Sequence, residues 1–429
     1  MELVITNKIK QLLTESAIVA FGKFIGAIGS LFAVYVLTNN LSPEQYGILN
    51  LAMTFSIIVN QLLIGPLGAG STRFFSASVE HNSSNVYLQI VFKFLQKINL
   101  IIVLFGIILI VIVGSIDISI NWTYIILSVV LFTIISSYYS IYNGIFLALK
   151  KQLVTSIHQS LEPWTKAIFA LICIMIFGDT GFIALIGYIL GIIIVSLSQK
   201  IIFSKICFAR EKKNNINWEK KILEYSFPFM LWGIFTAAHL ISDRWVLQTF
   251  STLSDVGMYS VLYQIGYFPI ILIISILVQV VTPYLYQQAG NGDDNVRMSK
   301  VRTISKYLLI IPLVLTATMT LFVYLLSGFI FEYIISEEYS KVEYLLPYMT
   351  IAAGLFSTGQ ATTLILQSET KTSMLIKPKI VTAVIGIILN IIGGMLFGIE
   401  GIVYALIVYA LIYLLWIQII IFNYKKEKY

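Results

Sequence analysis

Runs of about 20 apolar residues recur about twelve times along this chain, and this repetition restricts it to a membrane fold. A helix rises about 1.5 Å per residue, so about 20 residues cross the roughly 30 Å hydrocarbon core of a bilayer. The runs are continuous, as in residues 101–113 and 182–197, whereas a spanning β-barrel would alternate in polarity over about ten residues. With 58% hydrophobic and 11% charged residues, much of the apolar surface has to face lipid. We therefore expect an all-α polytopic membrane protein.

The expected transmembrane helices are separated by short polar connections, and their ends are set to within a few residues. The twelve spans are residues 17–37, 47–68, 99–115, 122–148, 161–178, 181–199, 227–249, 257–282, 307–328, 346–367, 380–397 and 401–422. Residues 1–16 resemble an interfacial helix that leads directly into the first span, without the small-residue site of a cleavable signal.

The basic residues fall in every second connection between these spans. Of the 28 lysines and arginines, all but four lie on one side; the exceptions are Lys341 on the other side and Lys23, Lys166 and Arg244 within spans. Basic connections are retained in the cytoplasm, so both termini are predicted to be cytoplasmic. The same bias explains the net charge of +7 without a nucleic-acid partner.

The most basic connection, residues 200–226, lies near the middle of the chain. It predicts two six-helix halves, residues 1–213 and 214–429.

A short internal likeness supports this division. The string Leu41-Ser-Pro-Glu-Gln-Tyr-Gly resembles Leu253-Ser-Asp-Val-Gly when two residues are dropped, so Gly47 and Gly257 each open an even-numbered span. An offset of six helices preserves the direction of the chain. The repeat therefore predicts parallel halves related by an axis along the membrane normal.

Motifs for enzymatic chemistry are not found in the sequence. Cys173 and Cys207 have no metal-ligand spacing, and the three histidines form no HExxH. No P-loop, GxGxxG after a strand or GxSxG occurs, and the outer connections are short, the longest being residues 329–345. We therefore expect a protein that is not an enzyme, with no metal and no cofactor, although a proton or sodium gradient could drive it.

Basic side chains at membrane depth are expensive unless they are paired or hydrated, so each is a candidate for function. Lys23 and Lys166 either line a hydrated cavity or extend their ammonium groups to the interface. Arg73 follows residues 65–70, a stretch rich in glycine with one proline, where we expect the helix to be broken; it could instead be a cytoplasmic anchor. The planar guanidinium of Arg244, near the outer end of the seventh span, suits a phosphate.

His239 and Asp243 lie four residues apart and would share one face of the seventh span. Such a pair could exchange a proton, or it could form a structural hydrogen bond within or between helices. We interpret Asp243 as the only acid well inside a span.

Aromatic and amide side chains also gather in three spans. They form either packing contacts between helices or a sugar-binding wall, in which rings stack on pyranoses and amides bond hydroxyls. These residues are Tyr138, Tyr142, Asn143, Tyr259, Tyr263, Gln264, Tyr267 and Gln360, with Thr358, Thr362 and Thr363 beside the last.

Three strings together resemble those of a known family. They are Leu41-Ser-Pro-Glu-Gln-Tyr-Gly, Ser242-Asp-Arg-Trp-Val-Leu and Val256-Gly-Met-Tyr-Ser. They look like the strings of bacterial polysaccharide-exporter flippases, which include O-antigen and teichuronic-type lipid-linked oligosaccharide translocases of the multidrug/oligosaccharidyl-lipid/polysaccharide (MOP) superfamily. The likeness covers the whole chain in length, twelve-span topology and loop sizes.

The resemblance implies two six-helix bundles around a central cavity that opens alternately to each side. It implies an undecaprenyl-diphosphate-linked oligosaccharide as substrate, a repeat unit for a surface polysaccharide such as the O-antigen of lipopolysaccharide or a capsule. A polysaccharide polymerase and a chain-length regulator would be partners. The cations that the resemblance places around the diphosphate match Lys23, Arg73, Arg244 and Lys166, and a coupling site at His239 and Asp243 is our own inference.

Two other classes remain open at this point. A multidrug or cation antiporter of the same superfamily would share the topology, but would more often carry several carboxylates in its cavity. A membrane-embedded glycan polymerase or ligase would handle the same lipid-linked sugar, but normally needs a larger outer loop than this chain offers.

Overall fold

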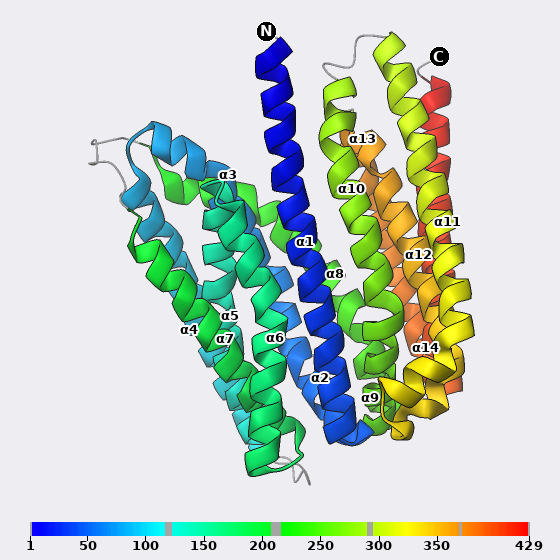
Figure 1. Cartoon of the computed structure of the whole chain (residues 1–429). Coiled ribbons are helices and arrows are strands. Elements are labelled where there is room, and N and C mark those ends of the chain that lie inside the picture. Colours follow the sequence, from blue (N-terminus) through cyan, green and yellow to red (C-terminus); the bar gives the residue numbers. More distant parts are fainter. Residues whose placement is uncertain (1, 116–121, 207–215, 290–294, 369–370, 428–429) are drawn as a thin grey trace. The chain divides into compact units, whose positions relative to one another are not determined.

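The structure is a computed structural model of the chain, and it describes residues 2–115, 122–206, 216–289, 295–368 and 371–427. Within these ranges every regular element is a helix (Figure 1). The α-helices are α1 (Glu2–Asn40), α2 (Pro43–Val59), α3 (Gly65–Glu80), α4 (Ser84–Gly114), α5 (Trp122–Ala148), α6 (Gln152–Phe177), α7 (Gly181–Ser204), α8 (Trp218–Phe250), α9 (Leu253–Leu262), α10 (Phe268–Ala289), α11 (Asn295–Tyr333), α12 (Leu346–Thr362), α13 (Leu364–Ser368) and α14 (Ile376–Glu427). The short elements are the π-helical turns η1 (Asn60–Ile64) and η2 (Tyr263–Tyr267) and the 3₁₀ segments η3 (Glu337–Leu345) and η4 (Thr372–Leu375).

The prediction of an all-α, multi-pass membrane protein is confirmed. Among the described residues, 10 segments are long and apolar enough to cross a membrane. The last of them, Ser373–Tyr424, includes most of α14 and holds both spans expected at residues 380–397 and 401–422, because the helix kinks at Gly398, where φ is +57°. The expected span at residues 227–249 lies in α8, which is not among the 10 segments.

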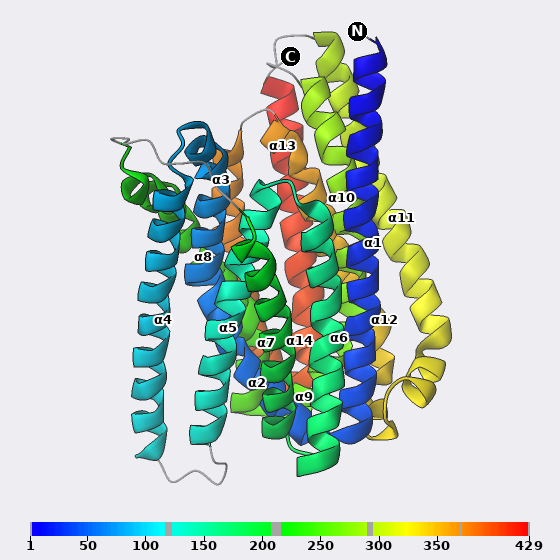
Figure 2. The ribbon, with the colours of Figure 1, turned by 60° about the vertical axis from the view of Figure 1, so that its left-hand side comes forward.

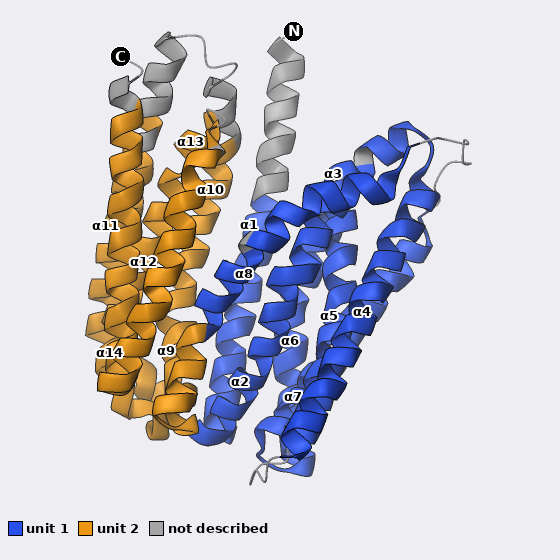
Figure 3. Ribbon diagram, turned by 180° about the vertical axis from the view of Figure 1, so that it is seen from behind, with its two compact units in different colours: residues 1–241 blue, residues 242–429 orange. Residues whose placement is uncertain are grey.

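The contacts divide the chain into two compact units, residues 1–241 and residues 242–429 (Figure 3). This division falls within α8. The boundary expected at residues 213 and 214 lies outside the described residues, so the predicted halves stay a prediction.

The two strings of the internal repeat begin their helices in the same way. The Ser42 hydroxyl accepts a hydrogen bond from the Gln45 amide at 3.4 Å, and the Thr252 hydroxyl accepts one from the Asp255 amide at 3.1 Å. Each cap satisfies an amide that has no partner within its helix. Both helices later pass through a π-helical turn, η1 after α2 and η2 after α9.

The expected break at residues 65–70 is wrong. The helix widens at η1 and continues as α3, in which Pro66 occupies one of the first two positions. The π-helical turn directly before Pro66, in which the Gly65 amide donates to the Asn60 carbonyl, is the local distortion that accompanies a proline within a continuous helix.

Glycines allow close helix packing in unit 1 (residues 1–241). A Cβ on Gly22 would lie 2.9 Å from that of Ser156, and Gly29 faces the ring of Trp164, whose Nε1 donates to the Ile25 carbonyl at 3.1 Å. These contacts hold α1 along α6, which Figure 2 shows side by side. On its other side, α6 packs on α7, where a Cβ on Gly191 would lie 2.7 Å from the Lys166 backbone nitrogen.

Buried rings fix one end of unit 1. Tyr87 is fully buried, donates to the Ser71 carbonyl at 2.6 Å and packs edge-on against Trp218 with ring centres 5.4 Å apart. The Trp218 indole donates to the Ser83 hydroxyl at 3.2 Å. The start of α8 is thereby joined to α3 and α4.

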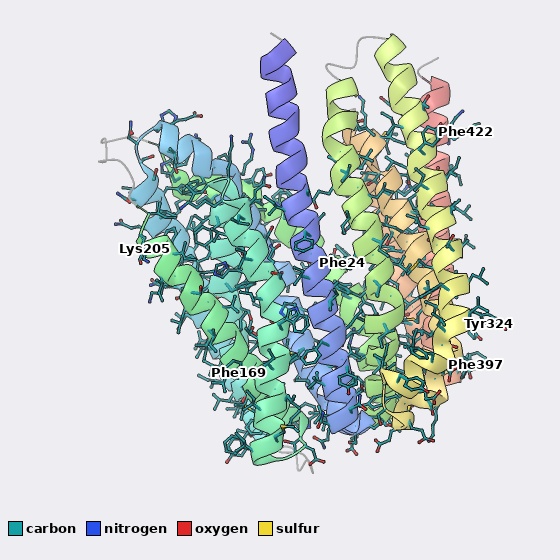
Figure 4. The ribbon with its side chains drawn as sticks, viewed as in Figure 1. Phe24, Phe169, Lys205, Tyr324, Phe397 and Phe422 are labelled. Atoms are coloured by element: carbon teal, nitrogen blue, oxygen red, sulfur yellow. The ribbon has the colours of Figure 1, made fainter. Side chains whose placement is uncertain are left out.

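Glycines also allow close helix packing in unit 2 (residues 242–429). Gly354 of α12 faces the Thr316 side chain of α11, and a Cβ on Gly359 would lie 2.8 Å from the Tyr413 ring of α14. Gly393 and Gly401 meet across the kink of α14, where the Gly393 carbonyl leaves no room for a Cβ on Gly401. Large apolar side chains such as Phe397 and Phe422 point outward, as expected for helices in lipid (Figure 4).

Replacing Gly191 with alanine should lower the thermal stability of the purified protein, because the new methyl group meets the α6 backbone, which cannot move aside as a flexible side chain can. We expect a loss of about 1–3 kcal/mol. The measurement is the loss of the monodisperse size-exclusion peak on heating in detergent.

Gly68→Ala is the matched control, because nothing lies within 4 Å of a Cβ at Gly68, which is also within a helix. Alanine there should be neutral or stabilising by up to about 1 kcal/mol. Equal melting of the two variants would contradict the packing account.

Candidate functional site

A buried cluster of charged and aromatic side chains occupies unit 2; we name Asp243, Arg244, Tyr259 and Tyr263 the Asp–Arg cluster. Asp243 and Arg244 lie in α8 and are only 3% and 6% exposed. An Asp243 carboxylate oxygen accepts from the Arg244 backbone amide at 2.8 Å and from its guanidinium at 3.4 Å. The other oxygen accepts from the Tyr259 hydroxyl.

The aromatic half of the cluster follows from helical spacing. Tyr259, Tyr263 and Tyr267 are four residues apart, so their rings follow one another along α9 and η2. The Arg244 guanidinium carbon lies 5.7 Å from the Tyr259 ring centre and 5.0 Å from that of Tyr263. Tyr263 in turn stacks on Tyr267, with centres 4.8 Å apart.

A second contact ties the same part of α8 to α14. Asn390 donates to the Ser242 hydroxyl at 2.8 Å, and both side chains are buried. The Asn390 carbonyl oxygen has no hydrogen-bond partner in the described structure. The polar groups in this part of unit 2 thus extend from η2 to α14.

The Asp–Arg cluster neutralises a cation that could not remain in the membrane alone. Arginine does not lose its proton in proteins, so a buried guanidinium needs a carboxylate, hydrogen bonds or ring faces around it. Arg244 has the Asp243 carboxylate, to which it donates a hydrogen bond, and the rings of Tyr259 and Tyr263. In this conformation its charge is therefore compensated from within the protein.

Unit 1 contains an ion pair that the sequence analysis missed. Lys166 Nζ lies 2.7 Å from a Glu162 carboxylate oxygen and 5.5 Å from the Tyr188 ring centre. The pair is partly buried. Glu162 also acts electrostatically on Tyr139, so side chains of α5, α6 and α7 surround the pair.

The interpretation of Asp243 as the only acid well inside a span is therefore wrong. The span expected there begins at residue 161, which places Glu162 at its very end. The structure instead starts α6 at Gln152 and places Pro163 in its interior. Glu162 consequently lies ten residues into a membrane-spanning helix.

The other two predicted cations lie apart from this pair. Lys23 is half-buried on α1, and Arg73 is exposed on α3, with its guanidinium 6.0 Å from the Phe74 ring centre. Because Gly22 faces Ser156 and Gly29 faces Trp164, α1 and α6 run in the same direction. Lys23 is then level with the residue after Ser156, about 13 Å before Lys166 at 1.5 Å per residue.

The aromatic and amide residues that were predicted to form a sugar-binding wall make packing contacts in some cases and hydrogen bonds in others. In unit 1, Tyr142 packs against Phe92 and Phe203, and Asn143 accepts from the Gln199 amide at 2.9 Å. Tyr138, like Phe92 and Phe203, packs against the buried core of unit 1 that contains Trp218. In unit 2, Gln264 and Gln360 are half-buried. A role of these residues in sugar binding stays a prediction.

His239 is half-buried on α8, four residues before Asp243. Asp243 is held by Arg244 and Tyr259. The proposed coupling role of the two residues stays a prediction, as does the diphosphate role of the four cations.

Buried amides are the other polar groups that the sequence analysis did not select. Asn99 accepts from the Ser137 hydroxyl at 3.0 Å, and Gln199 is fully buried against Asn143. A lone amide within an apolar run was the available signal for Asn99, Gln199 and Asn390, but such a run does not show which helix faces it.

Residues 12–288 match the family model described as "Polysaccharide biosynthesis protein". The chain belongs to this family. No curated protein sequence matches it.

Solved structures of the MOP superfamily share its fold. An inward-facing multidrug resistance MATE family transporter is 16% identical, with a TM-score of 0.71 over 95% of this chain and 99% of the other. The lipid II flippase MurJ, in an inward closed conformation, is 15% identical, with a TM-score of 0.71 over 95% of this chain and 87% of the other. A MOP superfamily transporter from Pyrococcus furiosus is 16% identical, with a TM-score of 0.61 over 96% of each chain. The predicted fold of two helical bundles is thereby confirmed.

Removing one member of the Asp–Arg pair should destabilise this family member more than removing both. Asp243→Asn and Arg244→Gln each leave a buried charge without its partner, at a cost of about 3–5 kcal/mol, whereas the double variant is neutral. Thermal unfolding in detergent of all four proteins in the double-mutant cycle measures the coupling.

The exposed pair Lys97 and Glu219, 3.9 Å apart, provides the control. Lys97→Gln should change the stability by less than about 1 kcal/mol, because an exposed ion pair is weak. Additive effects of Asp243→Asn and Arg244→Gln would show that the buried pair is not coupled.

Proposed function

We propose that this protein is a flippase that moves an undecaprenyl-diphosphate-linked oligosaccharide across the bacterial plasma membrane by alternating access. The observation that carries the proposal is the membership in the polysaccharide biosynthesis family, together with buried and half-buried cations at membrane depth. The proposal makes the protein a transporter and not an enzyme. It places both termini in the cytoplasm and makes a glycan polymerase and a chain-length regulator its functional partners.

The chemistry of the proposed substrate explains why such cations would be present. A diphosphate that leaves water loses its hydration, and opposite charge in a low-dielectric cavity compensates part of that loss. The sugars need a hydrated path, while the polyprenyl tail remains in the bilayer. Lys23, Arg73, Lys166 and Arg244 are the proposed diphosphate ligands.

Two of these cations already have anionic partners in the structure. Asp243 compensates Arg244, and Glu162 compensates Lys166. We propose that the diphosphate replaces these carboxylates during transport. The exchange keeps each cation paired in both states, and each released carboxylate takes up a proton or becomes hydrated in the open cavity, because a buried carboxylate without a partner is costly.

Translocation of a fluorescent undecaprenyl-diphosphate oligosaccharide in proteoliposomes tests the function. Accessibility to an external sugar-modifying reagent reports the movement. Lipid that crosses only when the protein is present supports a flippase, whereas transport of a cationic dye instead would establish the multidrug antiporter of the same superfamily.

The cationic mechanism predicts that Lys23→Ala slows this translocation at least about tenfold, because a charge at membrane depth costs several kcal/mol when it is not compensated and about 1.4 kcal/mol is a factor of ten. The Asp243→Asn/Arg244→Gln double variant should be equally slow while remaining folded. Lys341→Ala removes an exposed lysine in η3 and should have no effect. Normal transport by both Lys23→Ala and the double variant would rule out the mechanism.

Coupling to protons at His239 and Asp243 predicts a transport rate that changes between about pH 5 and 8, the range in which histidine ordinarily titrates. His239→Gln and Asp243→Asn should flatten this dependence. His158→Gln is the control, because both ring nitrogens of His158 are occupied in unit 1, by the Val154 carbonyl at 2.7 Å and the Ser198 hydroxyl at 3.1 Å. An unchanged pH profile in the His239 and Asp243 variants would leave the pair a structural contact.

A further inference from the structure

A groove of about 840 Å³ lies within unit 2 between α11, η3 and α12. The two helices touch where Thr316 packs against Gly354, and from there the groove continues past Thr320 and Tyr324 to Glu343 of η3. Apolar side chains supply most of its wall, among them Leu313.

The groove has the length and surroundings of a lipid site. Its lining residues on α11 run from Leu313 to Ser327, which is about 21 Å at 1.5 Å per residue and longer than the roughly 15 Å of one hydrocarbon leaflet. The neighbouring side chains Leu321 and Tyr324 are 59% and 67% exposed on a helix that spans the membrane, and Figure 4 shows Tyr324 pointing outward. The molecules that contact such a surface in a membrane are lipids.

Aromatic side chains mark the depth of the η3 end, which lies opposite the C-terminus of unit 2 (Figure 1). Phe329, Tyr333, Tyr344 and Tyr348 are 41% to 61% exposed there. Amphipathic rings gather at the level of the lipid headgroups. The groove therefore leads from the hydrocarbon region to the headgroup layer.

A carboxylate stands at that end of the groove. One Glu343 oxygen accepts from the Ser327 hydroxyl at 3.0 Å, and within the described part of the chain the carboxylate has no ion-pair partner. Because the side chain is half-buried, its charge is less screened than that of an exposed acid. It would bind a cation that donates hydrogen bonds.

The acidic residues around this end of the groove disfavour a lipid whose headgroup has a net negative charge. Glu332, Glu337, Glu338 and Glu400 belong to α11, η3 and α14 near this end, and Lys341 is the one basic residue of η3. Glu400 lies beside the groove, because it accepts a hydrogen bond from Tyr344, one of the lining residues. The electrostatic field at the mouth of the groove is thus negative.

We propose that this groove binds a membrane lipid with a primary-ammonium headgroup, such as phosphatidylethanolamine, with the ammonium on Glu343 and an acyl chain along α11. The site is separate from the Asp–Arg cluster and does not depend on the proposed function. A lipid held there would brace α11 against α12 at the membrane surface.

Native mass spectrometry of the full chain in detergent tests the site, with dioleoyl phosphatidylethanolamine, phosphatidylcholine and phosphatidylglycerol added singly at equal concentrations. Phosphatidylethanolamine should bind about tenfold more tightly than either of the others, because choline has no N–H to donate and glycerol leaves the headgroup anionic. Equal binding of the three lipids, or a preference for phosphatidylglycerol, would overturn the proposal.

Paired variants locate the binding. Glu343→Gln should reduce the preference to less than about twofold, whereas Glu338→Gln, an exposed acid of the same segment outside the groove, should retain it. Thr320→Phe should block the acyl chain and lower phosphatidylethanolamine binding about tenfold, whereas Thr318→Phe, on the exposed face of α11, should leave it unchanged. Unchanged selectivity in Glu343→Gln, or equal losses within either pair, would contradict the site.

Discussion

The cost of placing a charge in hydrocarbon governs this protein more than any other interaction. An isolated ionised side chain in the membrane is expensive, so the structure surrounds each intramembrane charge differently according to its depth and chemistry. Arg244 is enclosed by Asp243 and two tyrosine rings. Lys166 is paired with Glu162 one helical turn away. These pairings make the charged residues compatible with an otherwise apolar bundle.

Helix packing must work without the hydrophobic effect that drives soluble cores, because lipid tails are as apolar as leucine. Small residues make such packing possible, because they let the helix backbones approach closely. Gly22 and Gly29 bring α1 onto α6, and Gly191 brings α7 onto the backbone of α6. Buried amide pairs such as Asn143 and Gln199 add directional bonds between helices. The contacts that position Lys166 are thus backbone contacts, and they hold the ion pair in a defined place.

Internal pairing of the cations has a mechanistic meaning for a carrier of an anionic substrate. A cation that is already compensated can remain at membrane depth when no substrate is bound. Under the proposed function, a diphosphate would take the place of the carboxylate, and the released carboxylate would be protonated or hydrated. The π-helical turn at η2, beside Arg244, suits this use because such turns are rare and occur often at functional sites. The lipid groove on α11 and α12 is built on different residues and serves a different ligand.

The sequence alone determined the fold class, the family and nearly all of the spans. An apolar run of 20 residues and a basic connection are local properties, so they can be recognised without knowing which helices are neighbours. A local pattern misled at residues 65–70, where the chain stays helical through Pro66, so this stretch is not the break that the sequence suggested. Which groups face one another was decided by tertiary structure. The tyrosines that surround Arg244, the exposure of Arg73 and the groove beside Glu343 depend on helix rotation and register, and apolar stretches that face lipid on one side and protein on the other leave both undetermined.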